Sequence, residues 1–240
     1  MRSVALAFPD DPSSPVWTAD RLAPSAGAGE ARPTGHAALD AELPGGGWPA
    51  AGLTELLLPA PGCGELRLLA PALAASAQLW VAPPLQPYAP ALAALGLAVD
   101  RLTVATPATP ADAAWAAEQA LRSGTLAAVV WWQGETPLLP ATLRRLHLAA
   151  IEGGTPLFAL RPAAQRAQSS PAPLRLALEP IGPSRLAMEV FKRRGPPMAA
   201  PLVLTLPGLP LAARRARRLS TSTAGLSDAV VRPALAGLAA

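Results

Sequence analysis

Two patterns of apolar residues alternate along the chain up to about residue 170. Five short apolar runs are typical of strands, and the run at 126–133 is continuous, as expected for a central parallel strand. Longer segments between them have apolar residues every three or four positions, as in helices that cover a sheet. The strand-like runs are GLTELLL (52–58), AQLWVAP (77–83), DRLTVATP (100–107), LAAVVWWQ (126–133) and TPLFALRP (155–162). The helical segments are TGHAALDAELPGG (34–46), ELRLLAPALAASA (65–77), YAPALAALGL (88–97), ADAAWAAEQALRSG (111–124) and PATLRRLHLAAIEGG (140–154).

This alternation predicts an α/β fold whose mainly parallel sheet is flanked by helices on both faces. The pattern changes after Pro171, where LRLALEP (174–180) and SRLAMEVFKRR (184–194) alternate with a period of two. A short turn around Gly182 and Pro183 joins these two segments. We therefore expect an antiparallel hairpin at the edge of the sheet.

Composition divides the chain into three segments. Residues 1–33 are rich in Pro, Ala, Gly and Ser and are predicted to form an extended N-terminal lead anchored by Trp17. Residues 34–198 are the predicted core, and residues 199–240 are a basic, Pro/Ala-rich C-terminal tail with one apolar run, PLVLTLPGLPL. The N-terminus lacks the pattern of a secretory signal, and prolines interrupt the uncharged stretch 68–99, so neither predicts a membrane protein.

Positive charge comes almost entirely from arginine. The formal net charge is +4, and Lys192 is the only lysine in the sequence. Clustered guanidinium groups suit phosphate or carboxylate partners, although a GC-rich coding bias also enriches arginine. The single Cys63 excludes an intrachain disulfide and a cysteine-based metal site, in keeping with a cytoplasmic protein. The candidate residues for contact with DNA or an acidic partner are Lys192, Arg193, Arg194, Arg214, Arg215, Arg217 and Arg218.

The segment LPAPGCGELRLL (58–69) joins a predicted strand to a predicted helix, where a phosphate-binding loop belongs. Gly62 and Gly64 supply the turn. Glu65 and Leu66 occupy the positions of the lysine that reaches phosphate and of the Ser/Thr that holds magnesium. A carboxylate repels a triphosphate, and leucine offers no ligand to a metal. The loop is therefore predicted to be a structural turn that binds no nucleotide cofactor.

No other residues form a recognisable catalytic or metal-binding pattern. The strand that would end in a magnesium-binding acid ends in Trp131 and Trp132, which are expected to pack on opposite faces of the sheet. A base-stacking or partner-binding platform is the alternative for this pair. His36 and His147 lie on separate predicted helices without a nearby acid or cysteine in sequence. We therefore expect no catalytic residue, no metal and no cofactor.

Several segments, taken in order, resemble the core of RecA-type ATPases and, within it, the ImuA family of RecA/SulA-like accessory proteins. The resemblance spans roughly residues 15–198. It implies a RecA-like core of the P-loop type. The segments that carry it are TGHAALDAELPGGGWP, GLTELLLPAPGCGE, YAPALAALGLAVDRLTVATP, EQALRSGTLAAVVWW and RLAMEVFKRRGPP.

The resemblance also implies where the ATPase residues of RecA proteins would fall. The lysine and the magnesium-binding threonine fall on Glu65 and Leu66. The acid of the central strand falls near Trp132, and the glutamate that activates water falls near Pro83. Tyr88 falls near an aromatic residue that stacks on adenine. The residues for phosphate binding, for magnesium binding and for water activation are therefore missing together. This implies a degenerate ATPase rather than an enzyme.

The same resemblance implies a function. We expect a non-catalytic accessory protein, or adaptor, in DNA-damage-induced (SOS) translesion synthesis and mutagenesis. The implied partners are an ImuB-like Y-family protein and an error-prone DnaE-type polymerase, with RecA itself and DNA as further candidates. Two alternatives stay open: a cell-division inhibitor similar to SulA, and a nucleotide-dependent DNA-binding ATPase with a modified loop.

Overall fold

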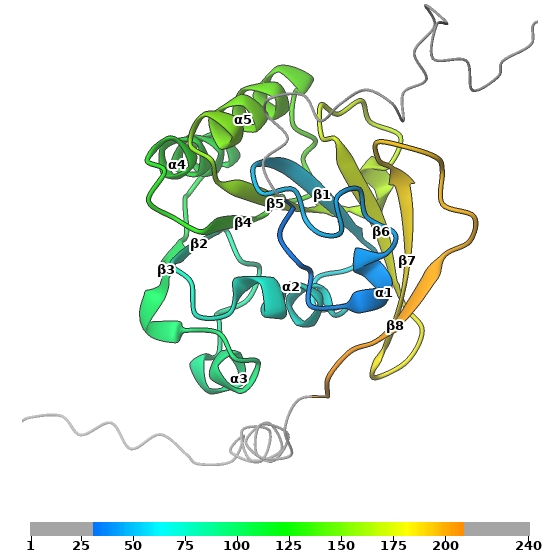
Figure 1. The fold of residues 1–240 in the computed structure, drawn as a ribbon. Helices are drawn as coiled ribbons and strands as arrows, with labels where there is room; N and C mark the ends of the chain where they lie inside the picture. Colours follow the sequence, from blue (N-terminus) through cyan, green and yellow to red (C-terminus); the bar gives the residue numbers. More distant parts are fainter. Residues whose placement is uncertain (1–30, 209–240) are drawn as a thin grey trace, which may run out of the picture. The chain divides into compact units, whose positions relative to one another are not determined.

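The computed structural model describes residues 31–208, which form an eight-stranded sheet with helices on both faces (Figure 1). Strands β1 to β6 run parallel to one another, β7 runs antiparallel to β6, and β8 runs antiparallel to β7. The predicted α/β fold with a mostly parallel sheet is thereby confirmed. In order across the sheet, the strands are β3 (Leu102–Ala105), β2 (Gln78–Val81), β4 (Ala128–Trp132), β5 (Pro156–Pro162), β1 (Gly52–Leu58), β6 (Leu174–Pro180), β7 (Arg185–Lys192) and β8 (Leu202–Thr205).

The helices lie in two layers. Figure 1 shows α4 and α5 side by side on one face of the sheet, with α1, α2 and α3 on the other. Each layer seals an apolar core against the sheet. The helices are α1 (Ala37–Asp40), α2 (Glu65–Leu73), α3 (Ala89–Ala94), α4 (Pro110–Arg122) and α5 (Pro140–Glu152), with short 3-10 segments η1 (Val99–Arg101) and η2 (Ala163–Gln165).

Local sequence sets the helix ends. The side chain of Thr109 accepts a hydrogen bond from the backbone N–H of Asp112 and so caps the start of α4. At the end of α3, Gly96 has a φ of +84°, and the Leu97 N–H donates to the Leu92 carbonyl oxygen at 3.1 Å. This is the glycine-terminated helix end that the sequence predicts. Proline stands at the start of α3, α4 and α5, where its missing N–H leaves no helix bond unmade.

Strand β1 lies at the centre of the core. All seven of its residues are buried, and they alternate between the two faces of the sheet. Leu53 packs toward α4 and α5, whereas Leu56 and Leu58 pack toward α1 and α2. The strand has β5 on one side and β6 on the other. Its carboxyl end therefore delivers the loop of residues 59–64 to the middle of the sheet.

The predicted hairpin forms, but it does not make the edge of the sheet. β6 pairs with β7 as expected, and β8 then pairs with β7 on the outer side. Beyond β8, Leu206 is 1 % exposed, and its N–H donates to the Ser184 carbonyl oxygen at 2.7 Å. The sheet and its core therefore continue past residue 198, the end of the core expected from sequence. This compact unit ends at Gly208.

The core also starts slightly before residue 34. The N–H groups and carbonyl oxygens of Arg32 and Trp48 form a two-bond bridge at 2.7 and 2.8 Å. This bridge positions the buried Trp48 ring, which meets Phe158 edge-on. None of the helices within residues 31–208 combines the length and the apolar character that a bilayer-crossing helix needs.

Candidate functional site at the carboxyl ends of the strands

The loop between β1 and α2 depends on two glycines. Gly62 has a φ of +85° and Gly64 a φ of +121°, in a region that favours glycine. Leu206 and Leu186 also approach the position that a Cβ of Gly64 would occupy, at 3.3 and 3.9 Å. The two glycines thus allow the chain to turn sharply into α2 while their N–H groups point into the loop.

The side chain of Glu65 fills the space that these N–H groups surround. Its Oε1 accepts from the Gly62 N–H at 2.7 Å, and its Oε2 accepts from the Gly64 N–H at 3.0 Å. Glu65 is 2 % exposed and is the first residue of α2, where a negative charge is favoured by the helix dipole. The backbone donors of this loop are therefore engaged by the chain's own carboxylate.

Cys63 lies between the two glycines and carries an unreactive thiol. Burial, together with the charge of the neighbouring Glu65 carboxylate, raises the pKa of this thiol to about 12. A thiol with so high a pKa is protonated at neutral pH and is a poor nucleophile. The loop therefore holds a neutral thiol beside the Glu65 side chain.

The other positions implied by the RecA resemblance are apolar. Leu66 packs against the core beneath α2. Trp132 is 7 % exposed and meets Trp80 edge-on at 5.2 Å between ring centroids. Trp131 is buried on the opposite face, beneath α4 and α5, so the expectation that the pair packs on both faces is confirmed. Tyr88 directly precedes α3, without a capping hydrogen bond from its side chain, and is 53 % exposed.

A cavity of about 430 Å³ lies beyond the ends of β1 to β5. The loop after β1 contributes residues 59–61, and the end of β4 contributes Trp131, Trp132 and Gln133. The loops after β2 and β3 complete the wall. Open α/β sheets place their ligands in this position, outside the carboxyl ends of the strands. The cavity is therefore the candidate binding site of the described chain.

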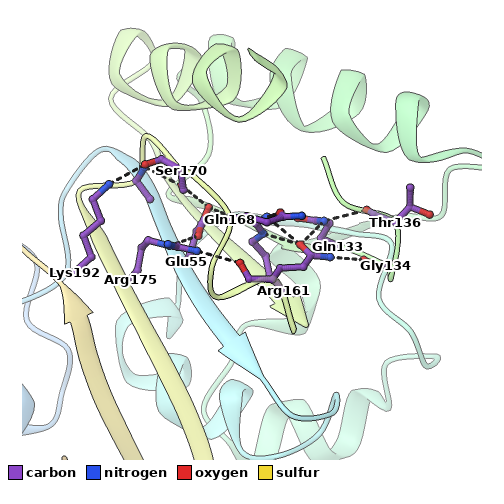
Figure 2. Close-up of polar contacts among 11 residues, drawn as sticks. Glu55, Gln133, Gly134, Thr136, Arg161, Gln168, Ser170, Arg175 and Lys192 are labelled. Carbon is purple, nitrogen blue, oxygen red and sulfur yellow. Dashed lines mark hydrogen bonds and ion pairs between the residues drawn. The ribbon is translucent and has the colours of Figure 1, made fainter. Parts of the chain in front are cut away.

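A buried ionic network adjoins the cavity, because Arg161 belongs to both; Figure 2 shows the polar contacts of this network. At its centre Glu55 of β1, fully buried, accepts from Arg161 Nη1 of β5 at 2.5 Å and from Arg175 Nε of β6 at 2.6 Å. The Ser170 hydroxyl donates to the same carboxylate at 2.5 Å. One carboxylate thus pairs with two guanidinium groups, one on each neighbouring strand. Burial lowers the pKa of Arg161, whereas the charge of Glu55 opposes that change.

Glutamine side chains extend the network to the loop after β4. Arg161 donates to the Oε1 of Gln165 through Nε and Nη2, at 3.1 and 2.9 Å. The Nε2 of Gln133 donates to the same oxygen at 2.7 Å and to the Thr136 carbonyl oxygen at 3.1 Å (Figure 2). Gln165 in turn donates to the carbonyl oxygen of Glu135 at 3.3 Å. Through these bonds Arg161 of β5 fixes the loop after β4, which forms part of the cavity wall.

Two of the predicted partner-binding residues are engaged within the chain. Lys192 Nζ donates to the Ser170 carbonyl oxygen at 2.8 Å. Arg193 donates to the carbonyl oxygen of Glu42 and forms an ion pair with its carboxylate at 3.0 Å. Arg194 is exposed. Arg214, Arg215, Arg217 and Arg218, like Trp17, lie outside the described residues. Among Lys192, Arg193 and Arg194, the three that the structure describes, Arg194 is thus the one whose side chain pairs with no other described residue.

The two histidines have structural contacts. His36 Nε2 lies 3.1 Å from the Leu68 carbonyl oxygen. His147 Nδ1 accepts from the Leu53 N–H at 3.1 Å, and burial together with the charges of Lys192 and Arg194 lowers its pKa. Acidic residues are also paired: Glu118 binds Arg122 at 2.8 Å and Arg145 at 2.6 Å. Within residues 31–208, no group of three His, Cys, Asp or Glu side chains is placed to hold a metal ion.

The ionic network was not predicted, although the sequence carries a signal for it. Glu55, Arg161 and Arg175 each interrupt an otherwise apolar strand pattern. A charge in a strand buried on both faces must be paired, because an isolated buried ion is very costly. Three such charges in one sheet therefore indicate mutual contacts. Which strands are neighbours is the missing information.

Solved structures that are similar to this chain include a SulA protein. SulA from Pseudomonas aeruginosa matches with 28% sequence identity and a TM-score of 0.38, over 45% of this chain and 96% of that chain. No protein-family profile and no curated protein matches the chain. Because so low a TM-score does not establish a shared fold, membership in a RecA, ImuA or SulA family stays a prediction from sequence.

We expect Glu55→Gln to destabilise the protein by about 3–5 kcal/mol, because it leaves Arg161 and Arg175 buried without a counter-charge. The matched control is Glu189→Gln, which removes a carboxylate from an exposed pair with Arg166 and is expected to cost less than about 1 kcal/mol. Urea unfolding followed by circular dichroism measures both changes. Equal losses in the two variants would contradict the central role of the network.

We expect Cys63 to resist alkylation in the native protein. At pH 8, a pKa near 12 leaves about a thousandfold less thiolate than the ordinary pKa of 9.0. Mass spectrometry of iodoacetamide adducts between pH 7 and 10 measures the rate, with denatured protein as the reference. Glu65→Gln should speed alkylation because it removes a charge that raises the pKa. A native rate equal to the denatured rate at pH 8 would refute this expectation.

Proposed function

We propose that this chain is a non-catalytic, RecA-like accessory protein of DNA-damage-induced translesion synthesis, which acts by binding protein partners. The observation that carries the non-catalytic part is the Glu65 carboxylate, which accepts hydrogen bonds from the Gly62 and Gly64 N–H groups. The translesion role comes from the sequence resemblance to the ImuA family. The proposed protein therefore has a loop of the phosphate-binding type that binds no nucleotide, and it contacts its protein partners through other parts of its surface.

Electrostatics supports the absence of nucleotide binding. A triphosphate that approached the loop would meet the Glu65 charge where a lysine would attract it, and unit charges 4 Å apart interact by about 4 kcal/mol near a protein surface. The phosphate would also have to displace a carboxylate from both of its backbone donors. Each charge-assisted bond of this kind contributes about 1.5–3 kcal/mol. Repulsion and competition therefore act against the same ligand.

Metal chemistry lacks its protein ligands as well. Leu66 packs into the core, and the end of β4 presents Trp132, so neither position offers an oxygen to magnesium. Hydrolysis of a nucleotide needs both a held metal and a positioned water. The missing metal ligands at the loop and at the end of β4 thus support the proposal that the chain does not hydrolyse a nucleotide.

The proposed partners are an ImuB-like Y-family protein and an error-prone DnaE-type polymerase, with RecA and DNA as further candidates. Strand β8 offers a surface for such contacts, because it forms one edge of the described sheet and Val203 on it is 42 % exposed. Edge strands expose backbone donors and acceptors that a partner strand can pair with. Arg194 adds an exposed positive charge on the segment between β7 and β8.

Isothermal titration calorimetry tests the non-catalytic part. We expect the full chain to show no saturable heat with ATP and Mg²⁺. Glu65→Lys should gain measurable affinity for the triphosphate, since it removes the internal anion and adds the missing cation, yet it should not hydrolyse ATP. Glu135→Lys, which adds the same charge at an exposed position of the cavity, is the matched control and should gain far less. Saturable ATP binding by the unaltered chain would overturn the proposal.

Co-purification with the two polymerase partners from the same genome tests the assembly role. We expect the full chain to retain the ImuB-like protein, and Val203→Lys to weaken this retention because it places a charge on the β8 edge. A chain that ends at Gly208 is the suitable truncation, since a cut at residue 199 would also remove β8. Failure of the full chain to retain either partner would contradict the proposal. Filamentation of undamaged cells on expression would favour the SulA-like alternative instead.

A further inference from the structure

The outer side of α5 carries two large apolar side chains that are exposed. Leu148 is 57 % exposed and Ile151 is 42 % exposed, and because they are three residues apart they lie on one side of the helix. The sheet-facing residues of α5 are already buried in a core, and are Leu143, Leu146, Ala149 and Ala150. Leu148 and Ile151, the α5 stripe, therefore form a second apolar surface on this helix. Neighbouring apolar side chains that remain in water indicate a contact site more strongly than scattered ones do.

Arginine charge on α5 is balanced on one flank of the helix and not on the other. Toward α4, Arg145 and Arg122 both bind Glu118, at 2.6 and 2.8 Å. Glu152, the only carboxylate of α5, lies on this flank as well, 3.8 Å from Arg122. Arg144 is exposed, precedes the α5 stripe by about one turn, and pairs with no other described residue. The unbalanced charge of the helix therefore borders the stripe.

The end of β7 adds two more cations beside α5. Arg193 turns to Glu42, which follows α1 on the opposite face of the sheet. Successive side chains of an extended chain alternate between the two faces, so Lys192 points to the α5 side. Burial and the charges of Lys192 and Arg194 all lower the pKa of His147 on α5. The charged groups that act on this histidine are thus both cations.

We propose that the α5 stripe and its bordering cations bind an acidic amphipathic helix of a partner protein. The apolar side of such a helix would cover the stripe, and its carboxylates would pair with Arg144 and Arg194. A helix laid along another helix meets side chains three and four residues apart, which is the spacing of Leu148 and Ile151. The proposal rests on the proposed partner-binding function and names the kind of segment that a partner would supply.

The side chains of the stripe favour a protein over a nucleic acid. Nucleic acids are bound through cations that contact phosphate and through aromatic rings that stack on bases. The stripe has aliphatic side chains at its centre, which do neither. Phe191 of β7 already lies against the guanidinium groups of Arg166 and Arg175, at 4.4 and 4.9 Å from its ring centroid. An apolar centre with a charged border is the pattern of a protein interface instead.

Fluorescence anisotropy with the full chain tests the apolar part of this surface. The probes are fluorescein-labelled peptides of about 20 residues that tile the two proposed polymerase partners, long enough for a helix of about 30 Å. We expect the peptides that bind to combine net negative charge with apolar residues every three or four positions. Leu148→Asp should weaken their binding about tenfold, because a charge replaces apolar area that the partner buries. Ile181→Asp, at a similarly exposed position (44 %) after β6, is the matched control and should change binding by less than about twofold.

Charge reversal tests the cations with the same peptides. Arg144→Glu combined with Arg194→Glu should weaken binding about tenfold. The same double variant should bind versions of the peptides in which lysine replaces each acidic residue, because the attraction is then restored with the signs exchanged. The control combines Arg101→Glu with Arg185→Glu, two exposed arginines whose side chains pair with no other described residue. This control should keep the acidic peptides and gain no affinity for the lysine versions.

The outcomes separate this proposal from the proposed function. Loss of binding in Leu148→Asp and in the charge-reversed chain, with both controls unchanged, supports the acidic helix. Bound peptides that are basic or uncharged, or binding that survives Leu148→Asp, overturn it. If no peptide binds while the intact partners still co-purify, the acidic helix is rejected and the accessory function stands; failure of both contradicts the function as well. A single-stranded DNA of about 20 nucleotides that loses affinity for the charge-reversed chain but keeps it for Leu148→Asp assigns these cations to nucleic acid and also rejects the helix.

Discussion

The carboxylate that two arginines share is the constraint on which the rest of this fold depends. Glu55 lies on the central strand, and its arginine partners lie on the strands to either side. The connection from β5 to β6 has no α-helix, only η2 and an extended stretch, and Ser170 of this stretch donates to the Glu55 carboxylate. Register is thereby coupled to charge, because a one-residue slip of β6 would turn Arg175 to the other face.

The same network couples the core to the candidate site. Arg161 holds Gln165, and Gln165 holds the loop after β4 through Gln133 and the Glu135 carbonyl oxygen. A cavity whose wall is tied to a buried ion pair changes shape only if that pair is disturbed. Rigidity of this kind suits recognition of one fixed group. The glycine loop on the other side of the cavity is held just as firmly, by the Glu65 carboxylate.

Sequence periodicity predicted the strands β1 to β7 and the helices, because burial on one or both faces leaves a direct pattern of apolar residues. It did not place β8, whose four residues are flanked by prolines and lie in a run read as part of a tail. Nor did it reveal the ion pairs, since partners more than a hundred residues apart become neighbours only through strand order. Glu65 shows the difference well. The missing lysine is visible in the sequence, but the carboxylate that turns back onto its own loop follows from backbone geometry alone.

The inward-turned Glu65 carboxylate also affects whether the conformation of this loop could depend on a dissolved ligand. A ligand joined covalently to its site stays at a local concentration that no dissolved anion of ordinary abundance matches. A nucleotide-driven protein alternates between states because its phosphates come and go, and each departure changes the free energies of those states. A loop filled by its own chain has no such departure. The carboxylate that fills this loop therefore stays with the chain, and its two hydrogen bonds do not depend on the arrival of a dissolved anion.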